Sequence, residues 1–163
     1  MNLKIYLLPL LLSSCSNVQL DFCNNENIQY EYKSTDGNIS RYRFDIKQQK
    51  FVVFGHHKMI DEPEWSEVSL ETKIDDQYFI VGSISISKNI FEESAWYEDG
   101  VNCKKIRGNE IEAYVECYSN KYAGSIRYLY NRRKGVILIQ EYYRNGAQIE
   151  SKLIGKFGLG YSC

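Results

Sequence analysis

Hydrophobic and polar residues alternate along most of this chain with a period of two. Between positions 110 and 118, Ile111, Ala113, Val115 and Cys117 alternate with charged or polar residues. Successive side chains of a β-strand point to opposite faces, whereas an amphipathic helix repeats its apolar positions every three or four residues. The alternation therefore predicts an all-β protein in which these four side chains face the core.

Turn sequences divide the alternating segments into about eight to ten strands with short connections. Asp36-Gly37 and Asn145-Gly146 are typical of two-residue hairpin turns, because glycine and asparagine accept positive φ. Strands joined in sequence by tight turns indicate an antiparallel meander, folded into a small barrel or a sandwich. The expected strands are 28–33, 39–46, 51–54, 65–74, 77–87, 110–118, 124–130, 136–144 and 148–157.

Segments 77–87 and 88–109 differ from the other segments. Segment 77–87 has one apolar face and one small, polar face, as expected for a sheet with water on one side. Residues 88–109 show no clear period, and 90–99 fits either a strand or a short stretch of helix. In 77–87 the expected inward set is Ile80, Ile84 and Ile86, and the expected outward set is Val81, Ser83, Ser85 and Ser87.

The N-terminus carries a different pattern. Lys4 precedes an apolar run at 5–12, which ends in Leu12-Ser13-Ser14-Cys15. A run of about eight residues is too short to span a bilayer, which needs roughly 20, but it suits the apolar region of an export signal. The motif resembles the lipobox of bacterial lipoproteins, in which a leucine and two small residues precede the cysteine that receives the lipid. An ordinary cleaved secretory signal and a buried first strand are the alternatives.

The resemblance implies a signal peptide at 1–14, a lipidated Cys15 as the mature N-terminus and a short tether at 15–22. Two or more acyl chains give stable membrane anchoring. By the same resemblance, Ser16 after the cysteine indicates an anchor in the outer membrane of the cell envelope, facing the periplasm. The remaining residues, 23–163, are expected to form a single β-rich domain.

Composition narrows the partners of this domain. The formal net charge of the whole chain is −1, which is close to neutral. A nucleic-acid-binding protein needs a concentrated basic face, so nucleic acid is not an expected partner. The chain contains 14 tyrosines, a residue that suits the half-buried surface of a sheet.

The cysteine count fits an exported protein. Once Cys15 is used for lipid, an even set of four cysteines remains, which favours two disulfides. Four cysteines allow three connectivities. We favour Cys23–Cys163, which would tie the start of the domain to its end, and Cys103–Cys117, which would close a short loop. Zinc is a weaker alternative, because no Cys-x-x-Cys spacing is present.

No catalytic residue, metal site or cofactor is predicted. His56 and His57 are the only histidines, and they adjoin a charged segment that is better explained as a solvated loop. The sequence has no Gly-x-Ser-x-Gly motif and no phosphate-binding glycine loop. Carboxylate pairs occur at turns or on the polar faces of expected strands, where solvation accounts for them.

The candidate binding residues are aromatic. Tyrosine and tryptophan often anchor interfaces, and loops on rigid β scaffolds often carry function. Segments 56–64 and 91–102 are the expected positions of such a surface, with Trp65, Phe91, Trp96 and Tyr97 as its residues.

Two functions fit these features. One is a non-catalytic binding module with a protein partner in the envelope, similar in size and architecture to lysozyme-inhibitor lipoproteins and periplasmic immunity proteins. The alternative is a carrier of a small ligand or lipid, or an envelope-assembly factor, with a cavity inside a barrel.

Overall fold

The computed structural model describes residues 20, 22–23, 28–56, 65–120 and 124–162. Within these residues the chain forms thirteen β-strands and no helix. The strands are β1 (Gln29–Ser34), β2 (Ile39–Asp45), β3 (Lys50–His56), β4 (Trp65–Leu70), β5 (Thr72–Ile74), β6 (Tyr78–Val81), β7 (Ile84–Ser87), β8 (Ala95–Glu98), β9 (Val101–Gly108), β10 (Glu112–Ser119), β11 (Gly124–Asn131), β12 (Gly135–Tyr143) and β13 (Gln148–Leu153).

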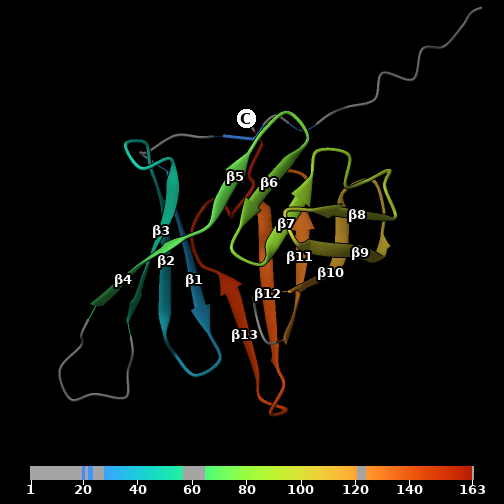
Figure 1. The fold of residues 1–163 in the computed structure, drawn as a ribbon. Coiled ribbons are helices and arrows are strands. Elements are labelled where there is room, and N and C mark those ends of the chain that lie inside the picture. The colour runs from blue at the N-terminus through green and yellow to red at the C-terminus, as the bar shows by residue number, and fades with distance from the viewer. Residues whose placement is uncertain (1–19, 21, 24–27, 57–64, 121–123, 163) are drawn as a thin grey trace, which may run out of the picture.

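Ten strands form one antiparallel sheet, and three form another. The large sheet has the order β4-β3-β2-β1-β13-β12-β11-β10-β9-β8, and the small sheet has the order β5-β6-β7. The large sheet curls, and the small sheet lies between its two arms (Figure 1). This confirms the all-β antiparallel prediction. The two edge strands, β4 and β8, do not pair with each other, so the large sheet is open. Of the two predicted arrangements, a sandwich therefore describes the fold better than a closed barrel.

Two expected strands are each broken in two. The chain leaves the large sheet after Leu70 and enters the small sheet at Thr72, whose Oγ1 accepts a hydrogen bond from the Phe51 amide at 2.8 Å and donates one to the Leu70 carbonyl at 3.0 Å. Segment 77–87 turns back at Gly82, where φ is +59°. The alternation of apolar and polar residues keeps its phase across both breaks. The positions of the breaks therefore could not be predicted from the alternation alone.

The region without a clear period is also a hairpin. β8 pairs with β9 around Asp99 and Gly100, which have φ values of +50° and +79°. Asp-Gly between two strands is a recognised turn sequence, so this hairpin carried a usable sequence signal. The helical alternative for 90–99 is wrong where β8 forms.

The predicted wet face of segment 77–87 is wrong. Ser85 and Ser87 are at most 1% exposed and Ser83 is 8% exposed, because the small sheet is covered on both sides. Ile111 was expected to face the core, but it lies in the turn before β10 and is 56% exposed.

The packed domain begins before its expected boundary. Leu20 and Phe22 are buried in the core, so the predicted tether at 15–22 includes residues that pack into the domain. The Leu20 amide donates to the Lys88 carbonyl at 3.2 Å, and Phe22 forms a β-bridge with Ser162.

The Cys103–Cys117 disulfide is confirmed. It joins residues that lie directly opposite each other on β9 and β10. Cys23 is also disulfide-bonded, and its amide donates to the Tyr161 carbonyl at 3.0 Å. Cys163 lies outside the described residues, so the Cys23–Cys163 pairing stays a prediction.

Four tyrosines fill the space between the layers. Tyr30, Tyr32, Tyr128 and Tyr130 are each at most 1% exposed. A buried hydroxyl needs a partner, and each of these donates to a main-chain carbonyl. The acceptors are Cys23 for Tyr30 at 3.4 Å, Val136 for Tyr32 at 2.8 Å, Ser85 for Tyr128 at 2.6 Å and Gly160 for Tyr130 at 2.9 Å.

These hydroxyls stay protonated in ordinary buffers. Burial raises the pKa of Tyr30 to about 12, and it raises the pKa values of Tyr32, Tyr128 and Tyr130 as well. A neutral phenol remains a hydrogen-bond donor, so the four links persist across the physiological pH range.

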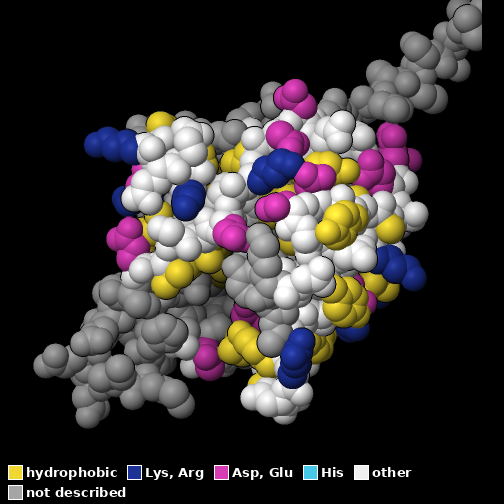
Figure 2. All heavy atoms as spheres, viewed as in Figure 1, with side chains coloured by type: hydrophobic (Ala, Val, Ile, Leu, Met, Phe, Trp, Pro, Cys, Tyr) yellow, Lys and Arg dark blue, Asp and Glu magenta, His cyan; other side chains and the backbone are white. Residues whose placement is uncertain are grey.

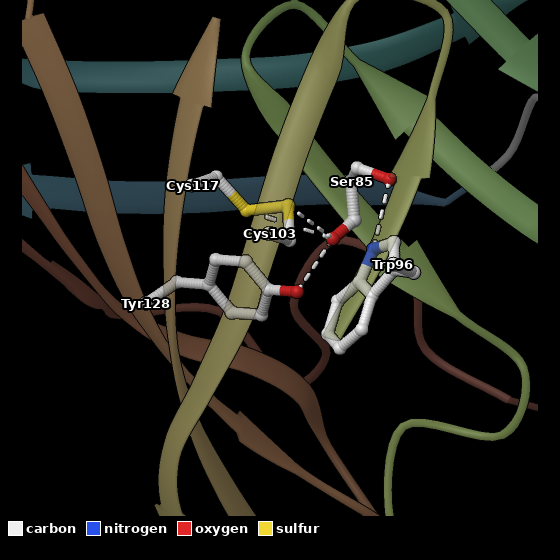
Figure 3. The surroundings of a disulfide bond; sticks show 5 residues. All are labelled: Ser85, Trp96, Cys103, Cys117 and Tyr128. Atoms are coloured by element: carbon white, nitrogen blue, oxygen red, sulfur yellow. Dashed lines mark hydrogen bonds between the residues drawn. A yellow bond between two sulfur atoms is a disulfide. The ribbon is translucent and has the colours of Figure 1, made fainter. Parts of the chain in front are cut away.

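The Tyr128 link attaches the small sheet to the large one. β7 is one of the two edge strands of the small sheet, and its Ser85 carbonyl accepts a hydrogen bond from the Tyr128 hydroxyl (Figure 3). The Trp96 indole donates to Ser85 Oγ at 3.2 Å. The sulfurs of Cys103 and Cys117 lie 3.6 and 3.9 Å from the same carbonyl oxygen. β7 is therefore held by contacts from β8, β9, β10 and β11.

Candidate functional site

A pocket of about 310 Å³ lies between the two sheets. Its apolar walls come from Cys117, Ile126 and Ile139 of the large sheet and from Leu70 at the end of β4. The β6–β7 turn, 81–84, forms the side that belongs to the small sheet. The volume is at the lower end of the range for small-molecule sites.

One carboxylate lies among these apolar walls. Residues directly opposite one another in a sheet share a face, and Glu141 belongs to an inward-facing row that crosses five strands. The other members of that row are Trp96, Cys103, Cys117 and Ile126. Glu141 is thus the ionisable member of a row that otherwise packs in the core.

The surroundings of Glu141 disfavour its charge. Burial raises the pKa of the Glu141 carboxyl, and a hydrogen bond from the Tyr143 hydroxyl, at 3.4 Å, opposes this shift only in part. Burial also raises the pKa of Tyr42, with a further contribution from the negative charge of Glu141. No lysine or arginine among the described residues forms an ion pair with Glu141.

The lining of this pocket suits the binding of a small molecule. Ser83, Ser119 and Ser125 also line the pocket, so a few polar groups are distributed over a mainly apolar wall. A ligand with an apolar body and one donor or cationic group would place that group at Glu141. Within the part of the chain that the structure describes, no group of three or more His, Cys, Asp and Glu side chains is positioned to hold a metal ion.

The aromatic residues expected to bind do not form one surface. Trp96 is only 6% exposed and belongs to the core, which corrects its assignment to a surface patch. Tyr97 points the other way and is 62% exposed. Phe91 is half-buried against Tyr130, with a ring separation of 5.9 Å. Trp65 begins β4, and its side chain lies outside the described residues, as does most of the loop expected at 56–64.

The sequence interpretation missed Glu141 and its neighbours. The signal was present: in 136–144, Glu141 occupies the same phase as Ile139 and Tyr143, where an apolar residue is expected. A charged residue in an inward position requires an explanation by pairing or function.

Among the described residues, no helix has the length and hydrophobicity required to cross a membrane. No protein-family model, curated protein sequence or solved structure matches the chain.

Proposed function

We propose that this protein is a lipid-anchored, non-catalytic binding protein of the bacterial cell envelope, and that its β-domain holds a small, mainly apolar ligand between the two sheets. The proposal of a ligand rests on one observation, the pocket that has Glu141 in its wall. The lipobox-like sequence ending at Cys15 supports the anchor, and Ser16 supports the outer membrane as its location.

Glu141 specifies the chemistry of the ligand. Glu141 is partly buried and has no cationic partner among the described residues, which disfavours its charged form, and a bound ammonium group would offset that cost. The apolar walls favour an alkyl or aromatic body on the same molecule. An amphiphilic amine therefore satisfies both parts of the pocket, and we assign the ligand to that class.

Hexylammonium is expected to bind the purified full chain more tightly than 1-hexanol, which has the same carbon chain and no charge. The difference should grow as pH rises through the pKa of Glu141, which lies above the usual 4.5, because only the ionised carboxylate pairs with ammonium. Isothermal titration calorimetry at several pH values measures both affinities.

The Glu141→Gln variant provides the decisive comparison. It should weaken hexylammonium binding about tenfold at neutral pH and remove the pH dependence. Glu67→Gln, which removes an exposed carboxylate from β4, is the matched control and should bind as the unmodified chain does. Equal affinities for hexylammonium and hexanol in the unmodified chain would contradict the proposed ligand class.

Anchoring is tested separately at Cys15. Cells expressing the chain and supplied with radiolabelled palmitate should label the protein, and Cys15→Ala should lose both the label and the association with membranes. Cys163→Ala is a control for loss of a cysteine and should retain the label. Labelling that persists in Cys15→Ala would refute the lipobox interpretation.

A protein partner is the second candidate, and the outer face of the large sheet favours it. Tyr97 and Tyr118 both lie opposite Asn102, so they share one cross-strand row, and they are 62% and 54% exposed. Ile106 is exposed on β9. Hydrophobic side chains lie among charged ones over β8 and β9 at the right of Figure 2. Exposed tyrosines of this kind are common in interfaces.

Site-specific photo-crosslinking tests this surface in the intact envelope. A photoreactive phenylalanine analogue in place of Tyr118 should give a discrete adduct with another protein. The same analogue in place of Lys134, which is exposed in the β11–β12 turn, should not. No adduct from position 118, or the same adduct from both positions, would rule the surface out as a specific protein-binding site.

A further inference from the structure

A second pocket, of about 390 Å³, lies where two turns of the large sheet meet the connection that joins the small sheet to the large one. Lys88 and Phe91 come from the connection between β7 and β8, and Lys105 comes from β9. Asn109 belongs to the β9–β10 turn, and Arg132 belongs to the β11–β12 turn. Most residues of this lining are charged or carry a side-chain amide, unlike those of the pocket at Glu141.

No carboxylate among the described residues lies within ion-pair distance of Lys88, Lys105 or Arg132. The Arg132 Nε–H is buried and has no acceptor there. Buried donors are nearly always paired in folded proteins, so this unpaired Nε–H in the guanidinium of a pocket residue needs an explanation.

Two of the three cationic groups, those of Arg132 and Lys105, are held in place by contacts within the protein. The Arg132 guanidinium lies over the Phe91 ring, 4.3 Å from its centre, and the Arg132 amide donates to the Ile111 carbonyl at 2.8 Å. Lys105 Nζ donates to the carbonyls of Ile90 and Phe91 at 3.1 and 2.8 Å. An ammonium group has three donors, so Lys105 keeps one for a ligand. Such fixed groups lower the entropic cost of binding.

The formal charge of the lining side chains indicates the charge of a ligand that would fit the pocket. Three cations are accompanied by Glu92 and Glu110, so the pocket carries a formal charge of +1. A monoanion neutralises this charge, whereas a phosphate dianion would reverse it close to two carboxylates. Arginine presents a planar fork that matches a carboxylate.

We propose that this pocket binds the carboxylate of a small polar acid, with Arg132 and Lys105 as its principal partners. Asn109, Glu92 and Glu110 can then bond to hydroxyl or amino groups of the same molecule. The site is separate from the pocket at Glu141, and the inference does not depend on the function proposed above.

Acetate is the minimal probe for this site. Titration of the ¹⁵N-labelled full chain, with its disulfides intact, should give saturable chemical-shift changes in the millimolar range. The changes should concentrate on the amides of Lys105, Asn109 and Arg132. Sodium chloride at equal ionic strength should not reproduce them.

Two neighbouring arginines provide matched variants. Arg132→Gln should weaken acetate binding about tenfold, because it removes the fork and its charge together. Arg133→Gln removes the same charge from the same turn, but Arg133 does not line the pocket, so the affinity should stay within about twofold. Lys88→Gln, in a different connection, should also weaken binding and guards against a local effect of the Arg132 substitution.

Three results would overturn the proposal. The first is the absence of saturable shifts with acetate. The second is equal weakening by Arg132→Gln and Arg133→Gln, which would show a diffuse electrostatic effect. The third is tighter binding of inorganic phosphate than of acetate at the same residues, which would assign the pocket to phosphate instead of carboxylate.

Discussion

The hydrogen bond from the Tyr128 hydroxyl to the Ser85 carbonyl is the interaction on which the arrangement of the two sheets depends. It lies in the buried interior, 2.6 Å long, and it joins β11 of the large sheet to the edge strand of the small one. A hydrogen bond of this kind contributes about 1 kcal/mol net to the stability of the fold. A buried carbonyl that is left without a donor destabilises the fold by about 1–3 kcal/mol. Tyr130 uses the same kind of bond to hold the C-terminal tail at Gly160. The Tyr32 hydroxyl donates to the Val136 carbonyl in β12 and accepts a hydrogen bond from the Leu159 amide of the tail at 2.8 Å.

The position of β7 also determines both pockets. The turn that precedes β7, at 81–84, lines the pocket that contains Glu141, and Lys88, immediately after β7, lines the pocket that contains Arg132. β7 therefore runs from one pocket to the other, held near its middle by Tyr128, Trp96 and the disulfide (Figure 3). A displacement of this strand would change the shape of both pockets together. This links the stability of the layer contact to the proposed binding functions.

The sequence predicted what short-range chemistry determines and missed what the layers determine. Alternation and turn residues located most strands, and the cysteine count led to the Cys103–Cys117 disulfide. The burial of Ser85 could not be predicted in this way, because it depends on a second layer that covers an apparently polar face. Glu141 was missed although its phase was visible, since a single inward carboxylate becomes significant only when its row of neighbours is known. The hairpin at Asp99-Gly100 also had a local signal, its Asp-Gly turn sequence, which the sequence interpretation did not use.

The most direct test is the free energy of unfolding of Tyr128→Phe, measured by urea denaturation of the full chain with its disulfides intact. The ring is retained, so the loss reports the hydroxyl and the Ser85 carbonyl that it leaves unpaired. We expect a decrease of about 1–3 kcal/mol for Tyr128→Phe and a change within about 0.5 kcal/mol for Tyr97→Phe, whose ring is exposed. Equal and small changes in the two variants would contradict the central role of the tyrosine link.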